Sequence, residues 1–180
     1  MPRSVAKVWL QPFHPGDDVA RVSAWLRRPH IVRWWGDPQT QLPAVLERPV
    51  GGADALIIAD RVPVGYVRWQ QTPRAELEAA GLHEIPDGSV DIDIAIGETD
   101  YIGCGVGSRA LQLVVQRLGS EKSLPLVMMA TSIDNASAIR AAEKAGFRRL
   151  RTFQDPEYGP CWLLACESPR PNTPLDAAPV

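Results

Sequence analysis

The stretch from Val90 to Arg109 constrains the fold more than any other part of this 180-residue chain. Its first half alternates, with Asp91, Asp93 and Ala95 on one side and isoleucines on the other. Strict alternation predicts a strand, because successive side chains of a strand point to opposite faces. Its second half places glycine at positions 103, 105 and 107, just before a helical pattern. The stretch therefore predicts a strand, a glycine loop and a helix in immediate succession.

The glycine loop indicates a site for a phosphate group. Glycines let the backbone turn tightly and aim its N–H groups inward, and a helix N-terminus adds partial positive charge. Two common phosphate motifs do not match. The spacing is GxGxG rather than the GxGxxG of dinucleotide folds, and Ser108-Arg109 stand where a P-loop requires Lys and then Ser or Thr. Glycine-rich loops are common, so this loop alone is a weak indication.

Acidic residues are concentrated in the same region. Eight acids and no Lys or Arg lie between Ala75 and Ser108. One interpretation is a solvated acidic loop, with Asp91 and Asp93 in a structural polar network. The other is a cleft for a positively charged substrate, because carboxylates in a strand need partners and a cleft of one sign concentrates ligands of the opposite charge. We favour the second interpretation.

The remaining elements predict a single α/β domain over residues 1–167. We expect strands at 5–13, 54–60, 62–71, 124–131, 147–153 and 160–167, and helices at 17–28, 39–47, 108–119 and 134–146. Asp17 or Asp18 is expected to cap the first helix, and Pro29 to end it. Gly65 is expected at a bulge or a close backbone approach. Four prolines between 168 and 180 predict a disordered tail.

The segment HIVRWWGD at 30–37 contains two adjacent tryptophans, and if it is irregular both indoles can hardly be buried on one face. Trp34 and Trp35 form either a hydrophobic plug over the core or an aromatic wall for a ligand. The sequence leaves both alternatives open.

Composition and charge exclude several classes of protein. A net charge of −2 gives no basic footprint for nucleic acid. No apolar run approaches the roughly 18 residues that span a membrane, and the N-terminal residues lack the apolar core of a secretion signal. The three cysteines have no metal-ligand spacing. We therefore expect a soluble, cytoplasmic protein without a bound metal.

The order of the elements, the glycine loop and the motif Asn-x-x-Ala…Glu-Lys-Ala-Gly-Phe at 135–147 resemble the GNAT superfamily of N-acetyltransferases. With HIVRWWG, Pro63-Val64-Gly65-Tyr66 and Asp93 ahead of Ile96-Gly97-Glu98, the chain resembles the aminoglycoside 6′-N-acetyltransferases. The resemblance implies a GNAT-type mixed, mostly antiparallel central sheet of about six to seven strands flanked by about four helices. It also implies a monomer or a homodimer.

The resemblance implies acetyl-CoA as co-substrate and a small cationic amine as acceptor. Residues implied to bind acetyl-CoA are Ile96, Ile102, Gly103, Cys104, Gly105, Val106, Gly107, Ser108, Asn135 and Ala138. Asn135 would meet the pantetheine arm, although a plain helix cap is equally compatible with the sequence. Asp93 is implied to be the catalytic base, and the residues implied to bind the acceptor are Trp34, Trp35, Tyr66, Asp91 and Asp93.

Two positions depart from the pattern of the resemblance. Ala142 stands where many such enzymes have a tyrosine that protonates the leaving thiolate. Either a water or Tyr66 serves instead, or the thiolate departs without a donor, or the protein is catalytically weak. Ala130 stands where the aminoglycoside enzymes have an aspartate, with Asp134 nearby but out of register. The alternatives are an acyltransferase for a siderophore, polyamine or peptide amine, and a CoA-binding module without turnover.

Overall fold

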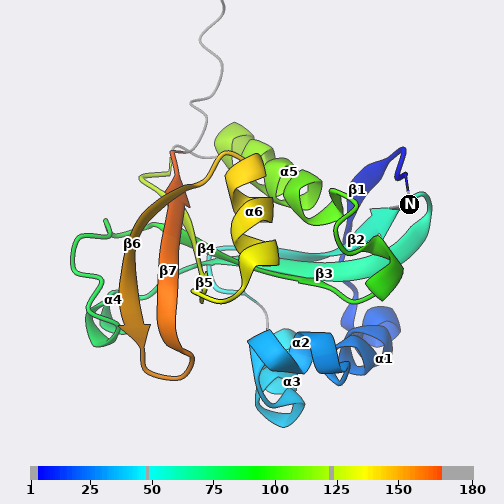
Figure 1. Ribbon diagram of the computed structural model, residues 1–180, viewed down its shortest axis with the longest axis horizontal. Helices are drawn as coiled ribbons and strands as arrows, with labels where there is room; N and C mark the ends of the chain where they lie inside the picture. Colours follow the sequence, from blue (N-terminus) through cyan, green and yellow to red (C-terminus); the bar gives the residue numbers. More distant parts are fainter. Residues whose placement is uncertain (1–3, 48, 122–123, 168–180) are drawn as a thin grey trace, which may run out of the picture.

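The protein is described by a computed structural model that covers residues 4–47, 49–121 and 124–167 (Figure 1). The expected disordered tail at 168–180 lies outside the described residues. Seven strands form one sheet: β1 (Val8–Pro12), β2 (Ala53–Ala59), β3 (Val62–Gln71), β4 (Val90–Ile96), β5 (Val127–Ser132), β6 (Arg148–Asp155) and β7 (Gly159–Cys166). The helices of the described chain are α1 (Pro15–Leu26), α2 (Pro29–Trp35), α3 (Pro38–Leu46), α4 (Arg74–Ala79), α5 (Val106–Glu121) and α6 (Ala136–Lys144).

The strand order β1-β2-β3-β4-β5-β7-β6 is antiparallel except at one place. There β4 and β5 run parallel and pair only at Val90↔Val127 and Asp91↔Met128. Beyond these two pairs no register joins the strands, so the sheet opens between them. The expected mixed, mostly antiparallel sheet is confirmed, and its opening lies directly beside the two aspartates of β4.

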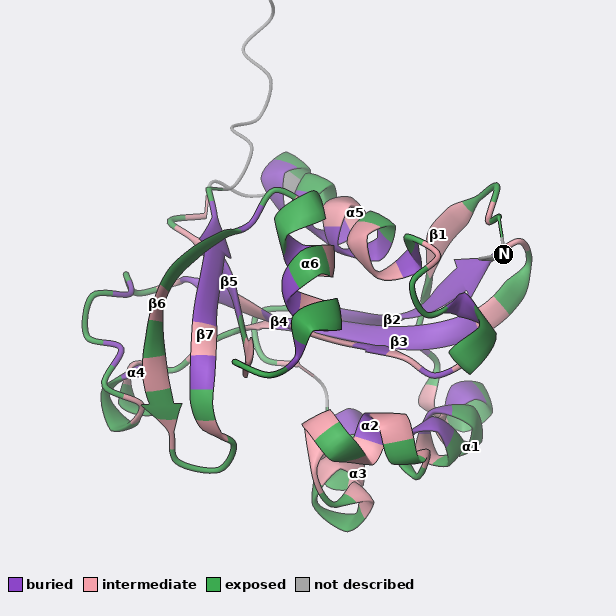
Figure 2. Ribbon diagram, viewed as in Figure 1, coloured by how far each residue is buried: buried purple, intermediate pink, exposed green. Residues whose placement is uncertain are grey.

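Helices cover both faces of the sheet (Figure 1). Helix α5 lies with α6 on one face, where Val106, Leu111 and Val114 belong to the largest buried cluster. The other face is covered by α1, α2 and α3, which pack through Val22 and Trp25 into a second cluster. Figure 2 shows the central strands β2 and β3 buried between these layers.

Strand β4 alternates as its sequence predicts. Ile92 belongs to the cluster under α5 and α6, and Ile94 and Ile96 pack against it, whereas Ala95 belongs to the cluster under α1 to α3. Since side chains alternate along a strand, the two aspartates face the same side as Ala95. The isoleucine face anchors β4 to the core, and the opposite face presents the carboxylates.

Gly65 combines both roles that its position predicts. The register between β2 and β3 shifts by one residue beside it, which is a β-bulge. A Cβ atom on Gly65 would lie 2.4 Å from the carbonyl oxygen of Ala95. Only glycine allows this approach of β3 to β4.

The segment at 30–37 is not irregular, because most of it belongs to helix α2. Pro29 occupies the first turn of α2, where a missing N–H costs nothing. The capping prediction for α1 is wrong. His14 is the N-cap, and Asp18 lies in the first turn, where its Oδ2 accepts a hydrogen bond from the His14 N–H at 2.9 Å.

No helix in the described part of the chain is long and apolar enough to cross a membrane.

Candidate active site

A cavity of about 360 Å³ lies where β4 and β5 diverge. Asp91, Asp93 and Ile94 of β4 form one wall, and residues 129–132 of β5 form the facing wall. The cavity also receives residues of α2, α3, α6 and the β6–β7 turn. The strands β4 and β5 move apart beyond their two paired positions. Side chains do not fill the space between them, so a cleft forms there.

Asp91 and Asp93 line this cavity side by side, as their spacing predicts. Both are half-buried, and desolvation raises the pKa of Asp93 and raises that of Asp91 well above the usual range. The negative charge of Asp93 raises the pKa of Asp91 further. Two adjacent carboxylates with raised pKa values are stronger bases, so each can accept a proton. A cation beside them favours their charged form.

Arg68 supplies a positive charge beside the aspartates, and sequence reasoning missed it. It stands opposite Asp93 in the β3–β4 register, lines the cavity and is 8% exposed. Its guanidinium donates to the Ala44 carbonyl at 2.7 Å and to Gln70 Oε1 at 2.6 Å. Because its charge opposes desolvation, it holds down the pKa values of Asp91 and Asp93. The signal in the sequence was the alternation of side chains along β3, which places Arg68 on one face of the strand next to β4.

The positions of the α2 tryptophans are compatible with both alternatives that the sequence left open, and a role toward a ligand stays a prediction. Trp34 and Trp35 are both half-buried and line the cavity. Trp35 also packs against the cluster under α1 to α3, as a plug would. The Arg33 guanidinium stacks over the Trp34 ring at 4.6 Å from its centre.

Tyr66 does not reach the cavity. It is buried at 1% exposure, and its hydroxyl donates to Asp54 Oδ2 at 3.2 Å. Burial raises the pKa of Tyr66, with the Asp54 charge adding to the effect. Its ring packs edge-on against Phe13. The structure thus separates Tyr66 from the other residues expected to bind the acceptor.

The glycine loop lies between the end of β4 and the start of α5. Gly103 and Gly105 have φ angles of 77° and 81°, a left-handed conformation that favours glycine. At the start of α5, the Arg109 N–H donates to the Gly105 carbonyl at 3.1 Å. Ser108 Oγ donates to the same carbonyl at 3.0 Å. The first N–H groups of an α-helix have no acceptor within the helix and have the polarity that a phosphate requires.

Other residues of this loop have separate surroundings. Ile102 is exposed, Cys104 Sγ donates to the Asp100 carbonyl at 3.5 Å, and Val106, the first residue of α5, is completely buried. A Cβ atom on Gly107 would lie 3.7 Å from Ala141 Cβ and 4.0 Å from Ile96 Cγ1. The start of α5 therefore lies close to β4 and α6, although no residue from 102 to 108 lines the cavity.

Asn135 and Ala138 bring α6 to the cavity. Asn135 caps the helix, since its Oδ1 accepts a hydrogen bond from the Ala138 N–H at 3.2 Å. Its Nδ2 donates to Thr131 Oγ1 at 3.1 Å, which fixes the amide across the β5–α6 loop. The helix-cap interpretation is confirmed, and a role toward a ligand stays a prediction. Ala142, about one helical turn after Ala138, is completely buried in the core.

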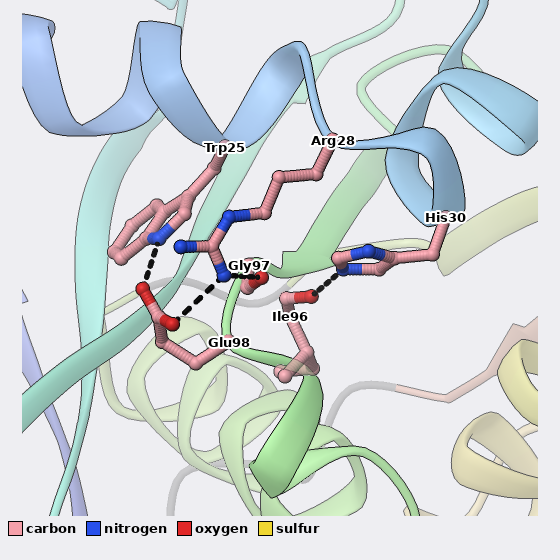
Figure 3. A network of polar contacts seen from close by, with 6 residues as sticks. All are labelled: Trp25, Arg28, His30, Ile96, Gly97 and Glu98. Atoms are coloured by element: carbon pink, nitrogen blue, oxygen red, sulfur yellow. Dashed lines mark hydrogen bonds and ion pairs between the residues drawn. The ribbon is translucent and has the colours of Figure 1, made fainter.

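A polar network fixes the end of β4 to the first helices (Figure 3). Glu98 accepts hydrogen bonds from Trp25 Nε1 at 2.7 Å and from Arg28 Nη1 at 2.8 Å. Arg28 Nη1 also donates to the Gly97 carbonyl at 2.7 Å, and His30 Nε2 lies 3.0 Å from the Ile96 carbonyl oxygen. The carbonyl can only accept, so His30 donates. The strand end that leads into the glycine loop is therefore held rigidly.

The turn between β6 and β7 adds two residues that sequence reasoning also missed, Asp155 and Tyr158. Both line the first cavity and a second one of about 320 Å³ beside α4. The signal was the sequence QDPEYG, in which an aspartate before Pro and Gly predicts a turn. Asp134, the acid nearest to the expected position, is exposed and lines neither cavity.

No cluster of three or more His, Cys, Asp or Glu side chains within the described ranges has the arrangement of a metal site.

Comparison with known proteins identifies the family. Residues 14–155 match the family model described as an acetyltransferase (GNAT) domain, which is well over half of the chain. The chain belongs to the GNAT acetyltransferase family. The expected enzyme class, an acyltransferase, is thereby confirmed.

Two curated proteins are similar in sequence to this chain. The chain is 29% identical over 150 residues to aminoglycoside N(6′)-acetyltransferase type 1 of Klebsiella pneumoniae, covering 78% of this chain and 74% of that one. It is 27% identical over 94 residues to a kanamycin resistance protein of Rhizobium radiobacter, covering 52% of this chain and 87% of that one.

Solved structures give the same result for the fold. The structure of AAC(6′)-Ib in complex with ribostamycin and coenzyme A has a TM-score of 0.74 at 26% identity, covering 90% of this chain and 94% of that one. The GNAT fold, which the sequence predicted from its glycine loop and the helix at 135–147, is confirmed over nearly the whole described chain.

Proposed function

We propose that this GNAT enzyme uses acetyl-CoA to acetylate an amine of a cationic, aminoglycoside-like small molecule. The observation that carries the proposal is the placement of Asp91 and Asp93 in a cavity between the diverging strands β4 and β5. The named relatives act on aminoglycosides, and AAC(6′)-Ib has been solved with both ribostamycin and coenzyme A. Aminoglycosides carry several ammonium groups, which suits the acidic wall of this cleft.

The donor half of the proposal depends on the glycine loop. The N–H groups from 103 to 108 and the N-terminus of α5 would hold the pyrophosphate of acetyl-CoA. Asn135 and Ala138 would face the pantetheine arm where they line the cavity. Ile102 contributes no polar side chain, so the backbone supplies the contacts with phosphate.

The acceptor half depends on a proton acceptor. An alkyl amine is mostly protonated near pH 7 and is nucleophilic only when neutral. Asp93 would bind the ammonium group and accept its proton, directly or through one water. The neutral amine then attacks the thioester carbonyl, forming the C–N bond, and backbone N–H groups stabilise the oxyanion as the C–S bond breaks. Asp91 and Asp155 would complete an anionic surface around the amine.

Protonation of the leaving thiolate needs a donor other than the residue at position 142. Ala142 has no hydroxyl, and Tyr66 is committed to Asp54 away from the cavity. We therefore assign this step to a water within the cleft, which passes to the thiolate the second proton that the attacking nitrogen loses.

A different acceptor amine is the second candidate. Ala130 lines both cavities where an additional carboxylate would strengthen binding of a polycation, and Arg33 and Arg68 add positive charge to the first cavity. These features favour an acceptor with fewer ammonium groups, such as a polyamine end, a siderophore amine or a peptide amine. We further propose a cytoplasmic enzyme that acts as a monomer or homodimer without nucleic acid.

The test is acceptor-dependent release of CoA, followed with a thiol reagent over a panel of aminoglycosides, polyamines and peptide amines. We expect Asp93→Asn to lower kcat/KM by about 10²–10⁴-fold, the usual contribution of a general base. Asp87→Asn is the matched control, because this exposed acid pairs with Arg74 and lines neither cavity. Unchanged turnover in Asp93→Asn contradicts the base assignment. Tight acetyl-CoA binding with no active acceptor indicates a binding module instead.

A further inference from the structure

Tyr158 stands at the boundary between the two cavities of the cleft. It lines both of them, together with Asp91, Ala130 and Asp155. The first cavity, of about 360 Å³, contains Asp93 and opens toward α6, whereas the second, of about 320 Å³, extends toward α4. A side chain that borders two adjoining cavities acts as part of the wall that separates them.

The turn between β6 and β7 holds the backbone of Tyr158 in place. Asp155 Oδ1 accepts hydrogen bonds from the N–H groups of Glu157 at 2.8 Å and Tyr158 at 2.9 Å. Gly159 follows with a φ of 74°, and Asp155 pairs with Gly159 across the hairpin. The start of the side chain is therefore fixed by a short, hydrogen-bonded turn.

The far end of the side chain is held by the helices across the cleft. The Tyr158 hydroxyl accepts a hydrogen bond from Gln41 Nε2 of α3 at 2.8 Å and donates to the Trp35 carbonyl at the end of α2 at 3.5 Å. A Cβ atom on Gly36 would lie 3.8 Å from the Tyr158 ring. The ring thus spans from the β6–β7 turn to the α2–α3 connection, segments more than 110 residues apart in sequence.

The chemistry of the hydroxyl agrees with this position. Desolvation, with the charges of Glu157 and Asp93 adding to it, raises the pKa of Tyr158 to about 12. A tyrosine phenol is neutral near pH 7 in any case, and this rise keeps it neutral at higher pH as well. It can exchange its two hydrogen-bond partners for a ligand without a change of charge. Its longer bond, to the Trp35 carbonyl, is at the limit of hydrogen-bonding distance and gives little resistance to such an exchange.

We propose that Tyr158 is a specificity-determining residue that partitions the acceptor site. An acceptor with one ring or a short chain fits beside Asp93 with the Tyr158 ring in place. A longer acceptor occupies both cavities only when the ring turns away from Gln41 and Trp35. Binding of a large acceptor must therefore break the hydrogen bonds of Tyr158 with Gln41 and Trp35, which lowers its affinity. Binding of a small acceptor leaves these hydrogen bonds intact. This inference rests on the proposed function, because it assumes that an amine acceptor binds beside Asp93.

The experiment compares two acceptors, glucosamine with one ring and kanamycin with three, on the wild-type enzyme, Tyr158→Phe and Tyr158→Ala. The measured quantity is the ratio of kcat/KM for kanamycin to that for glucosamine. Tyr158→Phe keeps the ring and loses both hydrogen bonds, so we expect the ratio to rise about two- to tenfold. Tyr158→Ala removes the wall, and the ratio is expected to rise at least tenfold. An equal ratio in all three proteins, or a fall in Tyr158→Ala, overturns the proposal.

Isothermal titration of the same two amines, without acetyl-CoA, separates this inference from the proposed function. If no acceptor is acetylated but the ratio of the two dissociation constants changes in the expected order, the proposed function fails and the partition stands. If both amines turn over with unchanged ratios, the partition fails and the proposed function stands. If neither amine binds any of the three proteins, both proposals are overturned. Thermal unfolding of each variant checks that the fold is retained.

Discussion

At the scale of single residues, the charges beside Asp93 decide how it can act. Asp91 lies two residues away on the same face of β4, and Arg68 faces Asp93 across the β3–β4 register. Desolvation raises the pKa of both aspartates, and Arg68 opposes this rise. Arg68 therefore lowers the pKa of both aspartates, whereas the charge of Asp93 raises the pKa of Asp91, which makes the two effects separable by experiment.

We predict that Arg68→Gln shifts the pH dependence of kcat/KM and that Asp91→Asn does not. Arg68→Gln removes a positive charge, so the acidic limb, where Asp93 loses its proton, moves to higher pH. Asp91 has the more strongly raised pKa and keeps its proton while Asp93 ionises, so Asp91→Asn leaves this limb in place. Arg68→Lys keeps the charge and is the matched control for the lost contacts with Ala44 and Gln70. An acidic limb that stays in place in Arg68→Gln contradicts this account.

Gly105 gives a second test at the residue scale. Its φ of 81° is costly for any residue with a Cβ atom, by about 1–2 kcal/mol, although there is open space around it. We expect Gly105→Ala to weaken acetyl-CoA binding about five- to thirtyfold in a titration, because relaxing the strain turns the loop N–H groups away. Gly81→Ala, with a φ of 68° in the connection before β4, is the control that leaves acetyl-CoA affinity unchanged.

At the scale of elements, the end of β4 and the helices α1 and α2 behave as one unit. The Glu98 carboxylate bonds both Trp25 and Arg28, and the Arg28 guanidinium holds down the pKa of Glu98 (Figure 3). Gly97 lies directly against the Trp25 ring, and a Cβ atom there would lie within 2.4 Å of three ring atoms. We therefore expect the packing of Gly97 against Trp25 to tolerate substitution less well than the ion pair of Glu98 with Arg28.

Two substitutions measure that difference in the free energy of unfolding. Gly97→Ala forces a methyl group into the buried Trp25 ring, and we expect a loss of about 1–3 kcal/mol. Glu98→Gln removes the ion pair with Arg28, whose side chains are 37% and 34% exposed, and we expect at most about 1 kcal/mol. Denaturant titration of both variants gives the comparison. A larger loss in Glu98→Gln than in Gly97→Ala would show that the polar network dominates.

At the scale of the whole molecule, the acidic cleft sets how stability depends on pH. A carboxyl whose pKa is higher in the folded state favours folding at low pH, and this contribution is lost as the pH rises through the folded pKa. Asp91 and Asp93 both have raised pKa values. Their contribution is therefore complete below about pH 4, the usual aspartate value, and falls above it.

We predict that Asp91→Asn stabilises the protein more at pH 8 than at pH 4. The asparagine carries no charge to desolvate and removes the repulsion of Asp93. Melting temperatures of the wild type and variant at both pH values provide the measurement, with Asp87→Asn as an exposed control. A larger gain at pH 4 than at pH 8 contradicts the direction of the pKa shift.

Local patterns were enough to predict many elements and half of the site. The alternation of β4, the glycine loop, and the Asn135 cap of α6 depend on neighbours in sequence, and the structure confirms all three as structural features. Helix α2 is not among the elements that the sequence predicts, because Pro29 can mark the end of α1 as well as the first turn of a new helix. Both uses of proline are locally possible, and packing of Ile31 into the core selects the second.

The sequence by itself determined the chemistry of β4 and the loop after it, because strand alternation and glycine conformation are properties of the local backbone. Only the tertiary structure decided what faces the aspartates. Arg68 comes from the neighbouring strand, and Tyr158 and Asp155 come from a turn more than 60 residues later. The tertiary structure also places Tyr66 outside the cleft, where its hydroxyl donates to Asp54. Such placements depend on strand register and on where β4 leaves β5, which no local pattern specifies.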